Sequence, residues 1–341
     1  MTQAPIAKPF VSILMPVRNE ADFIVRSVGA VLAQDYPAGC MEILIADGMS
    51  TDATRALIAG MAACHPAVPI TVLDNPAQIA PTGLNVAIAQ ARGDILIRVD
   101  GHCEIAPDYV SRCVAHLQGN ATLAGVGGPI ETIGDTLLSQ TIAIAMSSTF
   151  GVGNSTFRTG TTEPVEADTL AFPAYTRAAV ELAGPLDEEL VRNQDDEYNY
   201  RLRELGARLL LAPDVRSRYY SRGSLRTLAR QYYQYGYWKV RVMQKHPRQM
   251  RARQFAPPAL VAGLLGGGMV SLPYPRLRGA WYGIAGLYSM AILVASWRMA
   301  GRAGYHHLPW LPVVFPTLHL SYGLGFLVGL LRFAPRWWGP R

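Results

Sequence analysis

The sequence ILIRVDGHCE, residues 95–104, decides the fold expected for this chain. Branched apolar residues run directly into Asp100 and His102, which is typical of a buried strand that ends in polar groups. In open α/β sheets, ligands bind outside the carboxyl ends of the strands. Only Gly101 separates Asp100 from His102, so both side chains can approach one ion. A carboxylate beside an imidazole suits Mn²⁺ or a similar divalent metal.

The residues before this stretch alternate between short apolar runs and helical patterns. The apolar runs at 11–16, 41–46 and 70–73 predict three further strands, and residues 21–33, 53–61 and 81–91 predict helices between them. This spacing indicates βαβ units and a parallel sheet. No G-x-G-x-x-G motif follows the first strand, which argues against a dinucleotide-binding domain.

Polar groups also close the first two of these strands. The first strand leads into Arg18–Glu20, and the second ends at Asp47, directly before a glycine. Asp52 can be explained as a cap of the following helix. Asp47 is better explained as part of a site, because it closes the strand itself.

Charge is divided sharply along the chain. All 25 acidic residues lie at or before Asp214, where 13 basic residues leave a net charge of −12, whereas the residues from Val215 onward carry 18 basic residues and no acid. Long apolar runs beside these basic residues favour an anionic membrane surface over nucleic acid as the partner. The four cysteines form no CxxC pair, and the first residues lack a signal-peptide pattern. We therefore expect reduced thiols and a cytosolic N-terminal domain.

Three apolar runs near the C-terminus, at 256–275, 280–297 and 309–331, approach or reach the ~20 residues of a membrane-spanning helix. The first contains three consecutive glycines and could be re-entrant, so two or three embedded helices are expected. His319 in the last run could be functional or could bond a neighbouring helix. Upstream, residues 224–253 are basic and aromatic. They predict either a helix in the headgroup region or an ordinary amphipathic helix packed on the domain, with Ser224 as its cap.

Three motifs together resemble the nucleotide-sugar half of a family 2 glycosyltransferase with the GT-A fold. They are PVRNE at 16–20, DGMSTDAT at 47–54 and DGH at 100–102, where His102 replaces the family's second Asp. The chain is also similar to succinoglycan-biosynthesis glucosyltransferases of the ExoA type. The resemblance implies a Rossmann-like α/β GT-A domain at 11–222 after a tail at 1–10. A basic aromatic region at 223–255 and membrane-embedded helices at 256–335 would follow.

The resemblance also implies roles for residues on the donor side. The backbone of Pro16 and Val17 would line the base, and Glu20 and Asp47 would contact the nucleoside. Asp100 and His102 would hold a divalent metal, Mn²⁺ or Mg²⁺, on the diphosphate of a UDP-sugar.

A second cluster, RNQDDEYNYRL at 192–202, supplies the acceptor side. Three adjacent acids at a helix start gain from the helix dipole, so the cluster could be only an acidic first turn. The family, however, places a Glu-Asp pair here, and its Asp is the base of inverting transfer. Gln194 replaces the Glu and Asp195 matches the Asp, with Asp196 as the rival base. The predicted acceptor-binding residues are Asp196, Glu197, Gln234 and Trp238.

The resulting hypothesis is inverting transfer of a hexose, glucose in the first instance, to a saccharide on a polyprenyl diphosphate lipid. The enzyme would act in bacterial exopolysaccharide assembly at the inner membrane, with its catalytic domain facing the cytosol. Residues 231–235 match the Gln-x-x-Arg-Trp motif of processive relatives only in part, which favours addition of one sugar. The alternatives are a polyprenyl phosphate acceptor, another nucleotide-sugar donor, or a catalytically silent membrane scaffold. No nucleic-acid partner is expected.

Overall fold

The computed structural model describes residues 8–221 and 223–337, and it divides into two compact units. The first unit comprises the described residues up to Glu131 together with Gly160–Tyr219. The second comprises Thr132–Thr159 and the described residues from Tyr220 onward. Residues 132–159 therefore cluster with the C-terminal part, although the sequence placed them inside the catalytic domain at 11–222. The predicted tail at 1–10 lies mostly outside the described residues.

The first unit is built on an eight-stranded sheet with the order β3-β2-β1-β4-β9-β6-β10-β8. Its first four strands are parallel, as predicted: β1 (Val11–Val17), β2 (Met41–Asp47), β3 (Ile70–Asp74) and β4 (Ile95–Arg98). Every residue of β2 is buried, and six of the seven residues of β1 are buried. Burial on both faces explains why these strands read as continuous apolar runs.

The remaining strands make the sheet mixed, so the expectation of a parallel sheet holds only for its first half. Strand β9 (Ala174–Thr176) is antiparallel to β4 and to β6 (Leu123–Gly127). Strand β10 (Arg208–Leu211) is parallel to β6 and antiparallel to β8 (Val165–Glu166). A separate antiparallel pair joins β5 (Cys103–Ile105) to β11 (Ser217–Tyr220), while β7 (Ile130–Ile133) crosses the division between the units.

The sequence of residues 125–130 also predicts one strand, and as a single element this prediction is wrong. Strand β6 ends at Gly127 and β7 begins at Ile130. A proline at 129 has no N–H to donate to a strand ladder, so pairing stops there. Gly128 also lies so close to the backbone of Val215 that a Cβ at this position would meet the Val215 carbonyl oxygen at 1.4 Å.

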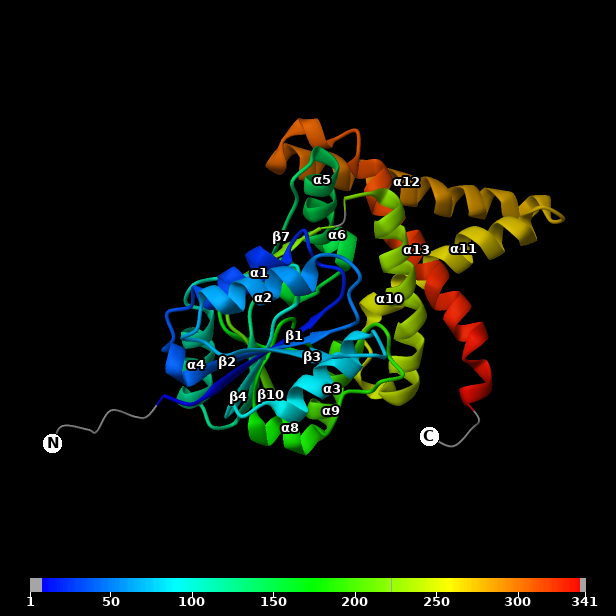
Figure 1. Ribbon diagram of the computed structural model, residues 1–341. Coiled ribbons are helices and arrows are strands. Elements are labelled where there is room, and N and C mark those ends of the chain that lie inside the picture. Colours follow the sequence, from blue (N-terminus) through cyan, green and yellow to red (C-terminus); the bar gives the residue numbers. More distant parts are fainter. Residues whose placement is uncertain (1–7, 222, 338–341) are drawn as a thin grey trace. The chain divides into compact units, whose positions relative to one another are not determined.

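Helices cover both faces of the parallel strands. Figure 1 shows α1 and α2 on one side of these strands and α3 on the other. The helical elements of the first unit are α1 (Ile24–Leu32), η1 (Ala38–Cys40), α2 (Thr54–Cys64), α3 (Ala80–Gln90), α4 (Tyr109–Gly119), α8 (Arg177–Ala183) and α9 (Gln194–Glu204).

A buried carboxylate joins β1, β2 and the turn before β4. Glu42 is 4% exposed and accepts hydrogen bonds from Ser12 Oγ at 2.7 Å, from the Arg92 backbone N–H at 2.8 Å and from Arg92 Nε at 2.9 Å. Burial alone would raise the pKa of Glu42, but these hydrogen bonds hold it below the ordinary value of 4.5. The ionised carboxylate is therefore part of the fold.

We expect Glu42 to make the stability of the protein pH-dependent on the acid side. Because its pKa is depressed in the folded state, its contribution is fully present above about pH 4.5 and is lost as the pH falls below that value. The unfolding midpoint of the wild type should therefore fall more steeply between pH 5 and 3 than that of Glu42→Gln. Denaturant titration at several pH values measures this, and parallel pH profiles would contradict it.

The second unit consists of helices. Its elements are α5 (Leu137–Met146), α6 (Thr149–Val152), α7 (Thr156–Thr159), α10 (Leu225–Lys245), η2 (Pro247–Gln249), η3 (Ala252–Gln254), α11 (Ala256–Ser271), α12 (Pro275–Ala303), η4 (Tyr305–His307), α13 (Leu311–Arg332) and η5 (Ala334–Trp337). Ser224 caps α10, as predicted, because its side chain accepts a hydrogen bond from the Thr227 backbone N–H. The small and apolar residues 137–150 predict one helix, but the structure divides it into α5 and α6.

Glycines allow α10 and α13 to pack closely. A Cβ at Gly236 would meet the Tyr322 carbonyl oxygen at 2.0 Å, and a Cβ at Gly325 would meet the Tyr233 carbonyl oxygen at 2.0 Å. Helix α10 buries a face that includes Leu228, Gln231, Tyr232, Gly236, Lys239, Val240, Val242 and Met243. Its packing on α13 agrees with an amphipathic helix that lies on its own unit.

We expect Gly325→Ala to destabilise the second unit by about 1–3 kcal/mol, because the added methyl group must push two backbones apart. Gly263→Ala is the matched control, since a Cβ at Gly263 in α11 meets nothing within 4 Å. Thermal unfolding of both variants in detergent provides the measurement. A Gly325→Ala midpoint equal to that of Gly263→Ala would show that this contact is not tight.

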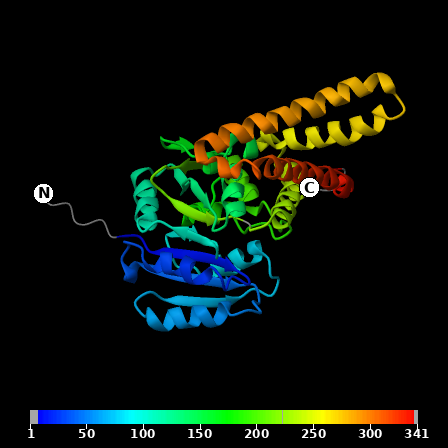
Figure 2. The ribbon, with the colours of Figure 1, turned by 90° about the horizontal axis from the view of Figure 1, so that it is seen from above.

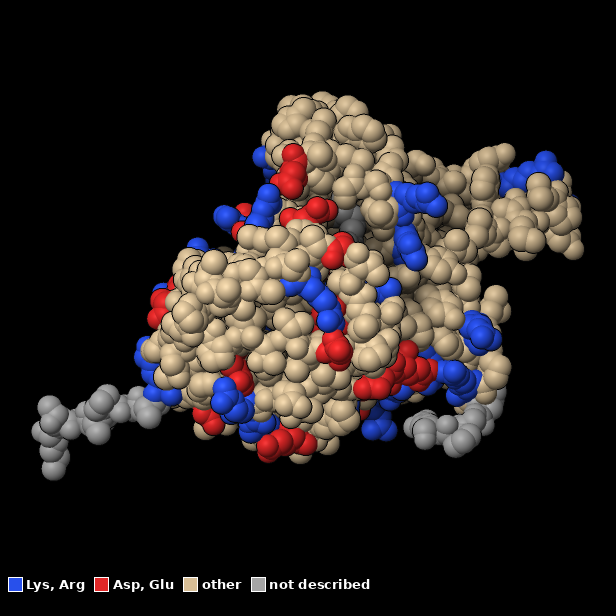
Figure 3. Space-filling model, viewed as in Figure 1, with Lys and Arg blue, Asp and Glu red and all other residues tan. Residues whose placement is uncertain are grey.

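Two helices among the described residues, α12 and α13, are long and apolar enough to cross a membrane. Figure 2 shows α11 and α12 side by side as a hairpin, and the face of this hairpin that is seen in Figure 3 carries little charge except near the turn between the two helices. Only Ile292, Ser296 and Ala300 are buried within α12. Leu287 and Trp297 are 65% and 60% exposed. An apolar helix this exposed is unlike the core helix of a water-soluble domain.

His319 bonds neighbouring elements of this unit, which was one of its two predicted roles. Its Nε2 lies 2.8 Å from the Phe150 carbonyl oxygen, and its Nδ1 lies 3.0 Å from the Tyr288 hydroxyl. The histidine therefore joins α13 to α12 and α6.

Candidate active site

The carboxyl ends of three parallel strands meet at one edge of the sheet. Strand β1 pairs in parallel with both β2 and β4, with Val17 opposite Asp47 and Leu14 opposite Arg98. Pro16 is half-buried and Val17 is buried at the end of β1. The ends of these strands and the loops that follow them carry all of the predicted donor-side residues.

The loops after β1 and β2 fix each other. The Asn19 N–H donates to Ser50 Oγ at 2.9 Å, and the Thr51 N–H donates to Asn19 Oδ1 at 2.8 Å. The Glu20 N–H donates to Thr54 Oγ1 at 2.9 Å. Asn19 has a positive φ of 52°, a conformation that asparagine adopts more readily than most residues. The backbone around Glu20 is thus held in one position.

Asp47 is fully buried and bonded within its own loop. It accepts hydrogen bonds from the Ser50 N–H at 3.0 Å, from Ser50 Oγ at 2.5 Å and from Arg55 Nε at 2.5 Å. Burial alone would raise the pKa of Asp47, but the hydrogen bonds from Ser50 and Arg55 lower it. Asp52 accepts a hydrogen bond from the Thr54 N–H at 3.0 Å, which agrees with a role at the helix start.

Asp100 follows β4 and is held by Arg98. Arg98 Nε and Nη2 donate to the two carboxylate oxygens of Asp100 at 2.8 and 3.1 Å. The two side chains are only 13% and 18% exposed. Burial alone would raise the pKa of Asp100, but Arg98 lowers it, so the carboxylate is ionised.

His102 is joined to Glu20 from the loop after β1. Its Nδ1 lies 2.9 Å from Glu20 Oε1, and its ring meets that of Tyr219 edge-on. Burial alone would lower the pKa of His102, but the hydrogen bond to Glu20 and further negative neighbours raise it to about 9. Gly101 permits this approach, since a Cβ there would lie 2.9 Å from Glu20 Cγ.

Asp100 and His102 fit a divalent cation shared with a ligand. A histidine that donates Nδ1–H to a carboxylate is oriented to bind a metal through Nε2. Asp100 retains acceptor capacity beyond its two bonds from Arg98, because a carboxylate has about four lone-pair sites. Within the described residues, no group of three or more His, Cys, Asp and Glu side chains could hold a metal alone. Two protein ligands would therefore have to be complemented by oxygens of the donor.

The predicted base lies at the start of α9. Asn193 precedes the helix with a positive φ of 61°, and Asp195 Oδ1 accepts a hydrogen bond from the Asp196 N–H at 3.0 Å. Asp195 and Asp196 are half-buried. Glu197 is 3% exposed and forms a two-point ion pair with Arg201, at 3.0 and 2.9 Å. The Glu197 carboxylate thus turns into the unit.

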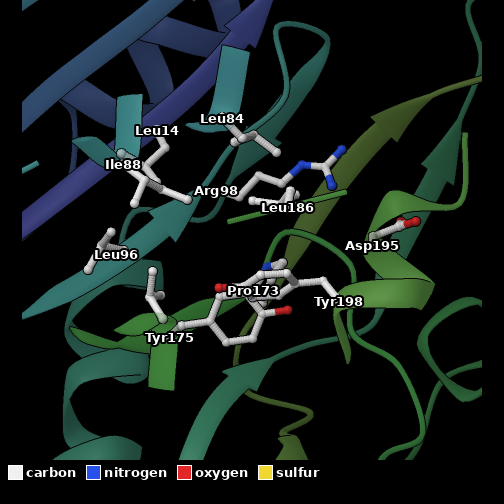
Figure 4. Close-up of a pocket in the computed structure, with 11 residues that line it drawn as sticks. Leu14, Leu84, Ile88, Leu96, Arg98, Pro173, Tyr175, Leu186, Asp195 and Tyr198 are labelled. Carbon is white, nitrogen blue, oxygen red and sulfur yellow. The ribbon is translucent and has the colours of Figure 1, made fainter. Parts of the chain in front are cut away.

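Asp195 and Arg98 line one cavity of the first unit. Figure 4 shows these two residues at one end of the cavity and Ile88 and Leu96 at the other. The rest of the lining is apolar or aromatic: Leu14, Leu84, Pro173, Tyr175, Val180, Leu186 and Tyr198. The cavity therefore connects the end of β4 with the start of α9.

Gln234 and Trp238, the other predicted acceptor residues, lie on α10 in the second unit. Trp238 packs against Tyr237 and Phe333, with ring centroids 5.4 and 5.8 Å apart. Its ring is thus committed in part to the packing of this unit.

The sequence assigned no role to Arg98, although it gave a signal for one. An arginine inside the apolar run ILIRV must find a partner when the strand is buried. The structure identifies that partner as Asp100. Gly101 was noted only as a spacer, and its contact with Glu20 depends on the fold of the first loop.

Comparisons with known proteins identify the family and the fold. The family model "Glycosyl transferase family 2" matches residues 12–176. The chain is 30% identical to the succinoglycan biosynthesis protein ExoA of Rhizobium meliloti, over 95% of this chain and 96% of that protein. It is 26% identical to a dolichyl N-acetyl-alpha-D-glucosaminyl phosphate 3-beta-D-2,3-diacetamido-2,3-dideoxy-beta-D-glucuronosyltransferase of Methanococcus voltae, over 95% and 98% of the two chains.

Among solved structures, the chain is similar to a mannosyltransferase from Pyrobaculum calidifontis in complex with GDP-Man and Mn²⁺. The TM-score is 0.61 at 18% identity, over 93% of this chain and 88% of that chain. This likeness shows the fold. By fold and by sequence, the chain belongs to glycosyl transferase family 2 and has the GT-A architecture.

Proposed function

We propose that this protein is an inverting hexosyltransferase that moves glucose from UDP-glucose to a saccharide carried on polyprenyl diphosphate. The observation that carries the proposal is the arrangement of three carboxylates around the end of β4. Glu20 and Asp100 flank His102, and Asp195 lines the same cavity as Arg98. Glycosyl transfer requires a donor site beside a base, and these groups supply both.

On the donor side, Pro16 and Val17 line the nucleobase, while Glu20 orients His102. Asp100 and His102 would hold a divalent cation, whose charge would stabilise the departing nucleoside diphosphate. Asp47 acts by fixing the Gly48–Thr51 loop against the nucleoside, because its carboxylate is bonded to Ser50 and Arg55.

On the acceptor side, Asp195 takes the proton of the attacking hydroxyl while that oxygen bonds to the anomeric carbon. The bond from the anomeric carbon to the diphosphate breaks on the opposite face, so the configuration inverts. Asp196 contacts the acceptor sugar. Glu197 contributes by holding the start of α9 through Arg201.

The length and apolar composition of α12 and α13 support attachment of the enzyme to a membrane. We assign it to the inner membrane with the first unit in the cytosol, where nucleotide sugars are made. The basic residues that follow Val215 suit an anionic lipid carrier.

A second acceptor class is supported by one relative. The name of the Methanococcus voltae protein specifies a sugar on dolichyl phosphate, which carries one phosphate rather than two. A saccharide on polyprenyl monophosphate is therefore the alternative acceptor. The two carriers differ in charge, and with either one a hydroxyl of the carried saccharide attacks the donor.

The test uses membranes that contain the protein, Mn²⁺, radiolabelled UDP-glucose and purified polyprenyl diphosphate or monophosphate saccharides. Metal-dependent label in the diphosphate lipid, absent after EDTA, is the expected result. Label only in the monophosphate lipid would select the second acceptor. Label only from GDP- or other nucleotide sugars would correct the donor. Nucleotide binding without transfer from any donor would make a membrane scaffold the better reading.

A further inference from the structure

Arg98 occupies an unusual position for a charged residue. It ends β4, between residues that are completely buried at Ile97 and Val99, and its side chain is only 13% exposed. A buried guanidinium is costly unless its hydrogen bonds and its charge are compensated. Its surroundings therefore need to supply negative charge.

Two carboxylates supply that charge from different elements. Asp100 accepts two parallel hydrogen bonds from Arg98, the strongest geometry for this pair. Asp195, from α9, lines the same cavity. Burial alone would lower the pKa of Arg98, whereas Asp100 and, after it, Asp195 raise it.

Among the described residues that line this cavity, Arg98 is the one cation. The walls of the cavity are otherwise apolar or aromatic, apart from Asp195 itself. Charges interact strongly across such a low-dielectric space. Figure 4 shows the guanidinium of Arg98 extending toward the end of the cavity where Asp195 lies.

We propose that Arg98 is a positioning residue that links donor binding to the base. In the ligand-free enzyme its guanidinium neutralises Asp100. When a cation and the donor diphosphate engage Asp100, the guanidinium is repelled by the cation and pairs with Asp195. This pairing adds the Arg98 guanidinium to the partners of the Asp195 carboxylate when a donor is present. The inference rests on the proposed roles of Asp100 and Asp195.

The first measurement is the affinity of the purified full chain for Mn²⁺ in the absence of substrates. The electron paramagnetic resonance signal of free Mn²⁺ reports how much of the ion is bound. Arg98→Gln should bind Mn²⁺ roughly tenfold more tightly than the wild type, because one competing positive charge is removed. Arg92→Gln is the matched control. It breaks a similar two-point pair with Glu42, away from the site, and should leave Mn²⁺ affinity unchanged.

The second measurement separates kcat from KM. Arg98→Gln should lower kcat at saturating Mn²⁺ by roughly tenfold or more without raising the KM for the donor, since only the base is misplaced. Arg98→Lys keeps the positive charge but not the two-point hydrogen bonding of the guanidinium. It should therefore retain wild-type Mn²⁺ affinity and show a kcat between those of the wild type and Arg98→Gln. If Arg98→Gln does not fold, the kcat of Arg98→Lys tests the proposal in its place.

The outcomes are distinct. Unchanged or weaker Mn²⁺ binding by Arg98→Gln would overturn the competition for Asp100. Tighter binding with an unchanged kcat would overturn the link to Asp195. Wild-type protein that binds no Mn²⁺, or Asp100→Asn that binds it as the wild type does, would overturn the proposed donor site and this inference with it.

Discussion

Asp195→Asn is expected to lower the rate of sugar transfer by about 10²–10⁴-fold while leaving donor binding near the wild-type level. An amide cannot take the proton of the acceptor hydroxyl. The substitution should be mild for the fold, because Asp195 Oδ1 accepts the Asp196 N–H and the amide oxygen of Asn can do the same. Single-turnover transfer of labelled glucose measures the rate, and calorimetric titration with UDP and Mn²⁺ measures donor binding.

Asp196→Asn is the matched control, because Asp196 is equally half-buried and adjacent on α9. It should change the KM for the acceptor more than kcat. Near-normal turnover by Asp195→Asn with a large loss in Asp196→Asn would move the base to Asp196. Equal, large losses of UDP binding in both variants would instead show that this turn of α9 belongs to the donor site.

The strand ends could be predicted because their cause is local. Apolar runs that stop at Val17, Asp47 and Arg98 produce buried parallel strands, and chain direction alone brings those ends to one edge. The later strands escaped prediction because they are short. Strand β9 has three residues, and it is defined by its antiparallel neighbours β4 and β6 rather than by its own pattern.

The contacts within the site depend on tertiary structure. The site side chains could therefore be predicted from the sequence, but their hydrogen-bond partners could not. His102 and Glu20 are 82 residues apart in the chain and meet only because β1 and β4 are adjacent. Nothing local distinguishes Glu197 from Asp195 and Asp196. Its carboxylate turns inward because Arg201, one helical turn later, also bonds the carbonyl oxygens of Ala183 and Pro185.

The C-terminal part shows the same limit. Its apolar runs predicted α12 and α13, but not the grouping of residues 132–159 with them. That grouping arises from contacts such as Thr141 Oγ1 with His307 Nδ1, at 2.7 Å across 166 residues. A hydropathy pattern also could not predict the close approach of α10 to α13 at Gly236 and Gly325.

Removing the metal, or the histidine proposed to hold it, is expected to cause the other large loss of activity. EDTA should abolish transfer, and Mn²⁺ should restore it. His102→Ala should lower Mn²⁺ affinity strongly, since only Asp100 remains as a protein ligand. Glu20→Gln should lower Mn²⁺ affinity or activity by about 10–100-fold, the usual effect of losing the partner that orients a metal-binding histidine. Activation curves over a Mn²⁺ series measure both variants.

His116→Ala is the matched control for these substitutions. His116 Nε2 lies 2.9 Å from Asp214 Oδ1, the same distance that separates His102 Nδ1 from Glu20 Oε1. The His116–Asp214 pair, however, joins α4 to the loop after β10. Loss of one histidine–carboxylate pair should thus affect stability in both cases and Mn²⁺ activation only in His102→Ala. If His102→Ala required no more Mn²⁺ than His116→Ala, His102 would be a turn residue. The cation would then be held by Asp100 and the donor diphosphate, with Glu20 free to contact the nucleoside directly.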